Sequence, residues 1–215
     1  MGQPRREHRG RQVRHRQRHL RRVGPVTTLR PAAFLDRDGV INVERDYVYR
    51  IEDFELLPGV VEALAGLQRA GYALVVVTNQ GGIGLGLYTE ADMQRLHTHL
   101  RSLLAEAGVQ LDGIFHCPHH PRSPDLAMRG PCGCRKPAPG MLLQAARELQ
   151  LDLPRSFLIG DKAGDVAAGR AAGVGQNFLA RSGHALTVAD IAQADAVYDD
   201  LLALVRQRIA PEPLA

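Results

Sequence analysis

The sequence predicts an α/β fold, in which helices cover both faces of a doubly wound parallel sheet. Short apolar runs alternate along the chain with longer segments of helical periodicity, which is the pattern of parallel strands joined by crossover helices. Several runs are apolar throughout, as expected of strands that are buried on both faces. A chain of 215 residues with 45% hydrophobic content is long enough for one domain with a substantial core.

The first half of the chain contains three predicted strands and two predicted helices. The strands are expected at 32–35, 73–77 and 113–116, and the helices at 58–71 and from residue 89 onward. Gly71 is a suitable C-terminal cap for the first helix, and Thr89 with Asp92 is a suitable N-terminal cap for the second. The glycine-rich segment 81–86 has neither the dinucleotide spacing nor a P-loop lysine, so we expect a flexible active-site loop whose early residues bind substrate.

The second half continues the alternation of helices and strands. Pro139 opens a helix with apolar residues at helical spacing, and an alanine- and glycine-rich helix is expected at 166–172. The remaining strands are expected at 157–159, near 174–179 and near 196–198, and a helix from residue 201 closes the chain.

Positive charge is concentrated at the N-terminus. Residues 1–24 contain nine arginines and one glutamate, a charge of +8, so the rest of the chain carries −4 of the total of +4. Such an arm could bind nucleic acid, but it has no aromatic residue to stack on bases. We therefore interpret residues 1–29 as a basic, disordered extension, or as an upstream stretch from a wrongly chosen start site, and residues 30–212 as one domain.

The composition also indicates where the protein acts. No apolar run approaches the ~20 residues that cross a bilayer, and the N-terminus lacks the apolar core of a secretory signal. Three cysteines, all within 117–134, argue against a disulfide framework. These features predict a cytoplasmic protein with no membrane partner, and we expect a monomer.

Two carboxylates, Asp36 and Asp38, follow the first strand, and Gly39 then lets the backbone turn. Residues two apart in an extended chain face the same side, so both are expected in one pocket at the carboxyl end of the sheet. Carboxylates this close repel unless a cation lies between them, and Mg²⁺ suits such a site. A polar turn uses the same residue types, so other parts of the chain must decide between the two interpretations.

Polar residues at other strand ends complete a set that is suited to phosphoryl transfer. Thr78 and Asn79 follow the second strand, Asp161 and Asp165 follow the fourth, and Lys136 opens the segment that leads into the fourth. Phosphoryl transfer through an aspartyl phosphate needs a carboxylate nucleophile, an acid/base partner, a hydroxyl, a lysine and an acidic metal site. Because all of these groups are present, we interpret Asp36 and Asp38 as part of an active site rather than as a simple polar turn.

These residues resemble the four motifs of the haloacid dehalogenase (HAD) superfamily of phosphatases, which have a Rossmann-like fold, over residues 31–180. The motifs are Asp36-x-Asp38-Gly39, Val77-Thr78-Asn79, Lys136-Pro137 and Gly160-Asp161-x-x-x-Asp165. The resemblance implies that Asp36 is the nucleophile and Asp38 the general acid and base, and that Thr78 and Lys136 bind the phosphoryl group. It also implies a Mg²⁺ site formed by Asp36, the backbone carbonyl of Asp38 and Asp161, with Asp165 supporting it from behind.

Residues 117–134 form a loop with the spacing of metal ligands. Its three thiolates and one imidazole form a closed tetrahedral zinc set: Cys117, His119, Cys132 and Cys134. His116 or His120 could replace His119, and buried free cysteines are the alternative to a metal. A loop of this length needs a cross-link to hold it in one conformation, and zinc would supply one. The metal would also hold the following Arg135-Lys136 pair over the active site.

The same loop indicates a narrower family. Cys-Pro-His-His-Pro at 117–121 and Cys-x-Cys-Arg-Lys-Pro at 132–137 resemble the D-glycero-D-manno-heptose-1,7-bisphosphate 7-phosphatases, over residues 31–205. These bacterial enzymes act in the biosynthesis of ADP-heptose, a lipopolysaccharide precursor. The resemblance implies a compact phosphatase with no large cap domain, whose partner is a small-molecule sugar bisphosphate. It implies substrate contacts from Glu44, Arg45, Asp46, Tyr47, Thr78, Asn79, Gln80, Gly81, Arg135, Lys136 and Lys162.

Other functions remain open. Histidinol-phosphate phosphatases share the same site and a similar zinc loop, although Arg135 favours a substrate with a second phosphate. A nucleic-acid-end phosphatase or a nucleic-acid-binding module would use the basic extension, but the acidic balance of residues 25–215 speaks against it. Val40 stands where many relatives have threonine, a difference that we expect to affect packing more than chemistry.

Overall fold

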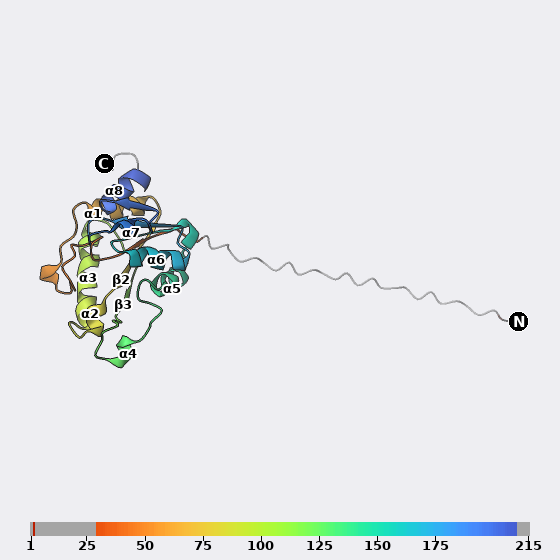
Figure 1. Ribbon diagram of the computed structural model, residues 1–215. Helices are drawn as coiled ribbons and strands as arrows, with labels where there is room; N and C mark the ends of the chain where they lie inside the picture. The colour runs from red at the N-terminus through yellow and green to blue at the C-terminus, as the bar shows by residue number, and fades with distance from the viewer. Residues whose placement is uncertain (1, 3–28, 210–215) are drawn as a thin grey trace.

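A computed structural model describes residue 2 and residues 29–209, which form one six-stranded sheet with helices on both faces (Figure 1). Apart from Gly2 and Leu29, the expected basic extension lies outside the described residues. The strands are β1 (Ala32–Leu35), β2 (Ala73–Asn79), β3 (Gly113–Cys117), β4 (Phe157–Gly160), β5 (Gln176–Ala180) and β6 (Ala196–Tyr198). They pair in the order β3-β2-β1-β4-β5-β6, and every pair is parallel. The predicted doubly wound sheet is confirmed.

The sheet separates two hydrophobic cores. In β1, Ala33 and Leu35 contribute to one core, while Ala32 and Phe34 contribute to the other. The first core includes residues of α1 (Val60–Arg69), α3 (Glu90–Glu106) and α8 (Leu201–Leu204), and the second includes residues of α5 (Gly140–Leu149) and α6 (Ala163–Ala172). Because both faces are covered, the strands can be apolar throughout, which explains the runs seen in the sequence.

Local sequence determines where the helices begin and end. Gly59 (φ 75°) precedes α1 and Gly71 (φ 84°) follows it, both in the left-handed conformation that glycine adopts without strain. At the start of α3, the Asp92 backbone N–H donates to the Thr89 hydroxyl, and the Thr89 N–H donates to the Asp92 carboxylate. This reciprocal capping box confirms the predicted cap.

Several short elements were not expected from the sequence. They are helices α2 (Gly81–Gly84), α4 (Leu126–Arg129) and α7 (Val188–Ile191), 3₁₀ turns at Ile51–Asp53 and Leu153–Arg155, and a π-helical turn at Val205–Ile209. The loop prediction is wrong for residues 81–84, because close packing holds them as a helical turn. A Cβ on Gly82 would lie 2.1 Å from a ring carbon of Tyr88, and a Cβ on Gly84 would lie 2.7 Å from the Pro118 carbonyl oxygen.

The connections between strands are compact. Between β1 and β2 the chain forms one 3₁₀ turn and α1, so this segment holds no large cap domain. None of the described helices combines the length and the apolar character that a membrane span requires.

Candidate active site

A cavity of about 350 Å³ lies at the carboxyl end of the sheet. The central strands β1 and β4 are adjacent there, and the chain connects outward from them in opposite directions, which is where open α/β sheets bind ligands. Its lining residues are Asp36, Asp38, Glu44, Asp46, Tyr47, Thr78, Asn79, Gln80, Gly81, Tyr88, His120, Arg135, Lys136, Lys162, Gly164, Asp165 and His184. The structure thus brings together residues that are as many as 148 positions apart in the chain.

The expected site residues occupy this cavity with two exceptions. The four expected catalytic residues line it, and so do all expected substrate-binding residues except Arg45. Arg45 instead forms an exposed ion pair with Glu55 and donates a hydrogen bond to the carbonyl oxygen of Asp53. Asp161, the expected metal ligand, is completely buried beside the cavity rather than in its lining.

Lys136 bridges two buried carboxylates. Its Nζ lies 2.9 Å from Asp36 Oδ1 and 2.6 Å from Asp165 Oδ1, and it donates to the carbonyl oxygen of Val77. Burial alone would lower the pKa of Lys136, but the two carboxylates outweigh it and raise that pKa above its ordinary value. Burial raises the pKa of Asp36 to about 7, against the opposing charge of Lys136. Asp36 therefore depends on neighbouring positive charge to remain a carboxylate.

The backbone of Lys136 is also held in place. The Lys136 N–H donates to Asn79 Oδ1 at 3.0 Å, and Asn79 Nδ2 donates to the Lys136 carbonyl oxygen at 3.1 Å. Because Asn79 ends β2, this double contact ties the loop that carries Lys136 to the sheet. Asn79 thus has a positioning function in addition to lining the cavity.

Asp38 is surrounded by hydrogen-bond donors. Nη2 of the buried Arg37 guanidinium donates to both carboxylate oxygens of Asp38 at 2.9 Å, and Asn42 Nδ2 donates to Asp38 Oδ1 at 3.0 Å. Arg37 itself is held by the carbonyl oxygen of Val48 at 2.7 Å and by a contact of 3.2 Å with the His97 ring. Burial, followed by the charge of Arg37, lowers the pKa of His97 to about 3, so the ring is neutral and accepts this hydrogen bond.

The two carboxylates reach the cavity by a different route from the one expected. β1 ends at Leu35, so an extended strand does not continue to Asp38. Instead the chain turns directly after Asp36, with the N–H groups of Ile41 and Asn42 both donating to the Arg37 carbonyl oxygen. The turn itself therefore places Asp36 and Asp38 in the cavity. The two interpretations of this sequence, a polar turn and a carboxylate site, do not exclude each other.

The buried acids have the chemistry of a divalent-cation site. Asp161 Oδ2 accepts hydrogen bonds from the His184 backbone N–H at 3.1 Å and from its ring Nδ1 at 2.6 Å. Asp161 Oδ1 is buried and has no hydrogen-bond partner among the described residues. Oxygens of Asp36, Asp161 and Asp165 lie within 4.8 Å of one another. An unpaired buried oxygen beside further carboxylates is what a hard cation such as Mg²⁺ requires, so these residues fit the expected metal.

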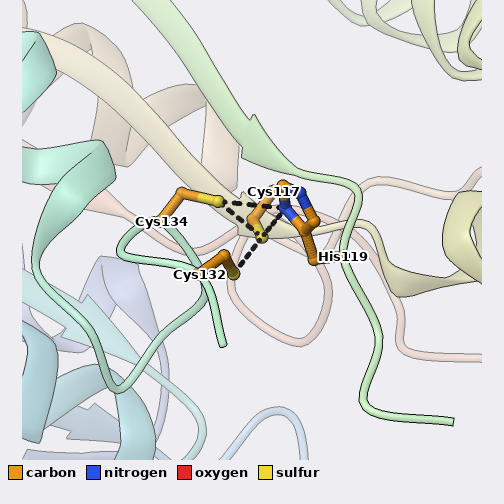
Figure 2. Close-up of side chains that lie close together, drawn as sticks. All are labelled: Cys117, His119, Cys132 and Cys134. Atoms are coloured by element: carbon orange, nitrogen blue, oxygen red, sulfur yellow. Dashed lines mark hydrogen bonds between the residues drawn. The ribbon is translucent and has the colours of Figure 1, made fainter. Parts of the chain in front are cut away.

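The cysteine loop brings its four expected ligands together (Figure 2). Cys117 Sγ lies 3.7 Å from Cys132 Sγ and 2.9 Å from Cys134 Sγ, and His119 Nδ1 lies 3.3–3.5 Å from two of the sulfurs. A tetrahedral zinc ion with Zn–S bonds of ~2.3 Å separates its ligand atoms by roughly 3.8 Å, close to most of these distances. All three cysteines are free, and burial raises the pKa of Cys117, so a thiolate there needs a nearby cation. The group fits zinc.

The structure also distinguishes the three candidate histidines. His119 is the histidine of the cysteine cluster, whereas His120 lines the catalytic cavity. His116 Nε2 instead lies 2.6 Å from Glu90 Oε1. The loop reaches the active site through Arg135, whose guanidinium donates to the carbonyl oxygen of His119 at 3.0 Å.

Four residues of the cavity were not singled out as active-site residues from the sequence. They are Tyr88, His120, Gly164 and His184. Asp161 directly follows β4, whereas His184 lies four residues beyond the end of β5, so a search of strand ends would have to extend into the following loop to find it. Tyr88 follows no strand, and its position depends on the packing of α2.

Comparison with known proteins identifies the family. A family model described as haloacid dehalogenase-like hydrolase matches residues 2–173. The chain belongs to this family. The HAD membership expected from the four motifs is confirmed, and the protein is a hydrolase.

Curated relatives of this HAD chain include proteins from two bacteria that are named D-glycero-beta-D-manno-heptose-1,7-bisphosphate 7-phosphatase. The one from Photorhabdus laumondii is 49% identical over 153 residues, which is 71% of this chain and 81% of the relative. The one from Escherichia coli K12 is 47% identical over 171 residues, which is 80% of this chain and 90% of the relative. The narrower resemblance drawn from the cysteine loop is therefore also confirmed.

Solved structures agree with the sequence relatives. A D,D-heptose 1,7-bisphosphate phosphatase from B. bronchiseptica, complexed with magnesium and phosphate, is 33% identical and superposes with a TM-score of 0.73. The match covers 85% of this HAD chain and 99% of that chain. A D,D-heptose 1,7-bisphosphate phosphatase from Burkholderia thailandensis is 28% identical, with a TM-score of 0.57, over 82% of this chain and 97% of that chain.

Proposed function

We propose that this HAD hydrolase removes the 7-phosphate of D-glycero-D-manno-heptose 1,7-bisphosphate in the biosynthesis of a lipopolysaccharide precursor. The observation that carries the proposal is the identity of 46–49% over most of the chain with relatives named for this reaction. The geometry supports it, because a single cavity contains the acids and lysine for phosphoryl transfer and the further cations Arg135 and Lys162. We expect the protein to act as a cytoplasmic monomer.

The first chemical step transfers the phosphoryl group to the protein. A carboxylate oxygen of Asp36 attacks phosphorus, and the bond between phosphorus and the oxygen on C7 breaks. Asp38 gives its proton to that oxygen, so the sugar leaves as a neutral alcohol and Asp36 carries the phosphoryl group. Thr78 and Lys136 bind the phosphoryl oxygens during the transfer, Thr78 through its hydroxyl and Lys136 through its ammonium group.

The second step releases phosphate. Water attacks the phosphorus of the aspartyl phosphate while the Asp38 carboxylate takes one proton from it. The bond between phosphorus and Asp36 breaks, so Asp36 is again a carboxylate and Asp38 again holds its proton. The same two residues are then ready for another turnover.

Two metal ions have different functions in this proposal. Asp36, the backbone carbonyl of Asp38 and Asp161 would hold Mg²⁺, with Asp165 behind them. When bound, Mg²⁺ supplies positive charge that lowers the pKa of Asp36 and neutralises the phosphoryl oxygens. The four residues of the cysteine cluster would hold a structural zinc, which keeps the segment with Arg135 and Lys136 in place.

The substrate contacts follow from the charges in the cavity. We infer that Arg135 binds the second phosphate, because its guanidinium fork suits bidentate contact with phosphate. Glu44, which lies 3.8 Å from Lys162 Nζ, offers its oxygens to sugar hydroxyls, together with Asp46 and Tyr47. A monophosphate would leave Arg135 without an anionic partner, so the cavity favours a bisphosphate over histidinol phosphate.

A phosphate-release panel tests the proposal. We expect kcat/KM for heptose 1,7-bisphosphate to exceed that for histidinol phosphate by at least about 100-fold, since loss of one charged contact costs several kcal/mol. It should also exceed that for fructose bisphosphate, whose sugar presents different hydroxyls to Glu44, Asp46 and Tyr47. Asp36→Asn should abolish release at saturating Mg²⁺ and serves as the control for contaminating phosphatases. Equal rates on all three substrates would indicate a general phosphatase. A preference for histidinol phosphate would indicate that histidinol phosphate, and not the heptose bisphosphate, is the substrate.

A further inference from the structure

Tyr88 lies at the start of a chain of hydrogen bonds that ends on the catalytic residues. It is almost completely buried, and its phenolic oxygen lies 2.6 Å from Gln80 Oε1. The other end of the buried Gln80 amide is in contact with both expected phosphoryl-transfer partners: Nε2 lies 2.8 Å from Thr78 Oγ1 and 3.2 Å from Asp38 Oδ2.

The chemistry of the partners determines how the Gln80 amide is oriented. Both carboxylate oxygens of Asp38 accept hydrogen bonds from the Arg37 guanidinium, so the amide group that faces Asp38 is the donor, Nε2. Oε1 then faces Tyr88, whose hydroxyl donates to it. Burial raises the pKa of Tyr88, so the phenol keeps the proton that this hydrogen bond needs.

This orientation leaves the Thr78 hydroxyl in the state that the reaction requires. Gln80 Nε2 donates to Thr78 Oγ1, so the hydroxyl hydrogen of Thr78 remains free to donate to a phosphoryl oxygen. A rotated amide would present Oε1 instead, which would take the Thr78 hydrogen and place an acceptor beside the Asp38 carboxylate. Both changes weaken phosphoryl transfer.

The surroundings of Tyr88 hold its ring in one position. Tyr49 stacks on it with ring centroids 4.8 Å apart and planes 10° from parallel. On α2, Gly82 allows this close packing, because a Cβ there would lie 2.1 Å from a Tyr88 ring carbon. The phenolic oxygen is therefore fixed relative to Gln80, as a positioning group must be.

We propose that Tyr88 is a positioning residue which, through the Gln80 amide, holds Asp38 and the Thr78 hydroxyl in their working geometry. The inference rests on the proposed function, since it assigns general-acid chemistry to Asp38. No contact between Tyr88 and substrate is needed for it.

The variant Tyr88→Phe removes the hydroxyl and keeps the ring and its stacking. General-acid help matters for an alkoxide leaving group and hardly at all for 4-nitrophenolate, which leaves without a proton. We therefore expect kcat/KM for heptose bisphosphate to fall about tenfold and kcat/KM for 4-nitrophenyl phosphate to fall by a smaller factor of about threefold, because only the Thr78 contact matters for that substrate. Tyr49→Phe is the matched control, because its hydroxyl contacts Arg50 rather than Gln80, and it should leave both values unchanged.

A double-mutant cycle tests whether Tyr88 acts through Gln80. In a Gln80→Ala background, Tyr88→Phe should have no further effect, because the group that it orients is gone. Independent, multiplying losses would overturn the inference, and so would equal losses on the two substrates. If the wild type does not hydrolyse heptose bisphosphate, the proposed function fails, whereas the leaving-group comparison still tests Tyr88 with the fastest alkyl phosphate of the panel.

Discussion

At the scale of single residues, the site depends on a balance of buried charges. Asp36 and Asp165 share the cation of Lys136, and all three side chains are buried. Removing Lys136 would leave both carboxylates uncompensated, and breaking a buried ion pair in this way typically costs 3–5 kcal/mol. The charge of Lys136 therefore also contributes to the stability of the fold.

The raised pKa of Asp36 predicts how the stability of the Mg²⁺-free protein depends on pH. Burial raises this pKa from 3.8 to about 7 in the folded state, so the folded chain binds the proton more tightly than the unfolded chain. The stabilisation from this group is complete below pH 3.8 and is lost as the pH rises through 7. Asp36→Asn removes the carboxyl group whose ionisation destabilises the fold at high pH. We therefore expect the substitution to raise the melting temperature more at pH 8 than at pH 5.

Thermal unfolding in magnesium-free buffer without chelator measures this effect and leaves any zinc in place. Asp53→Asn, at an exposed aspartate, is the control and should shift the melting temperature little at either pH. A gain for Asp36→Asn that is the same at pH 5 and pH 8 would contradict the prediction.

At the scale of elements, the cysteine loop connects the Cys117/His119/Cys132/Cys134 cluster to the active site. Cys117 ends β3, while Cys132 and Cys134 come from the segment that runs directly into Arg135 and Lys136. A metal joining these two segments would restrain the cationic residues from both sides. Loss of the metal should therefore lower both stability and turnover.

The two neighbouring histidines allow a matched test of this metal. His119→Ala removes an imidazole from the cysteine cluster, so we expect metal analysis to show well under one zinc per chain and a lower melting temperature. His120→Ala removes an imidazole from the cavity wall, so that variant should keep about one zinc per chain. Equal zinc contents in the two variants, or none in the wild type without chelator treatment, would refute the site.

The sequence allowed the strands and their functional ends to be predicted, because strand period and strand-end chemistry are local signals. Asp36, Thr78 and Asp161 were found in this way. Helix α2 was missed because glycine has low helix propensity. Packing against Tyr88 and the cysteine loop holds these glycines in the helical turn. Arg45 was expected in the cavity, but the following residues have φ of 51° and 57°, a loop conformation that no residue pattern indicates.

Tyr88 could not be predicted for a different reason. Its importance depends on which atom of Gln80 its hydroxyl touches, and hydrogen bonds between side chains of separate elements leave no periodic trace in a sequence. The same holds for His97, which supports Asp38 through the guanidinium of Arg37. Residues that act through another residue need coordinates to be recognised.

At the scale of the whole molecule, the cavity residues lie between Asp36 and His184. We therefore expect a chain that starts at Leu29 to keep the full chain's kcat and KM on the preferred substrate within about twofold, as for other changes far from a site. Steady-state phosphate release from the two purified chains checks this. A large loss of turnover on truncation would assign the N-terminal arginines a function in catalysis.

The order of the strands has a consequence for how the protein is made. β1 pairs with β2, for example at Ala33 and Leu74. Its other neighbour, β4, pairs with it at Ala33 and Phe157 among other positions, and Phe157 is made 124 residues after Ala33. At a synthesis rate of ~5–20 residues per second, the ribosome takes roughly 6–25 s to make that interval. Throughout this time the middle strand of the finished sheet is an open edge, the kind of surface on which nascent chains aggregate. Asp36 is among the first parts of the cavity region to emerge and Asp161 among the last, so we expect the nascent chain to be inactive until its final quarter is translated.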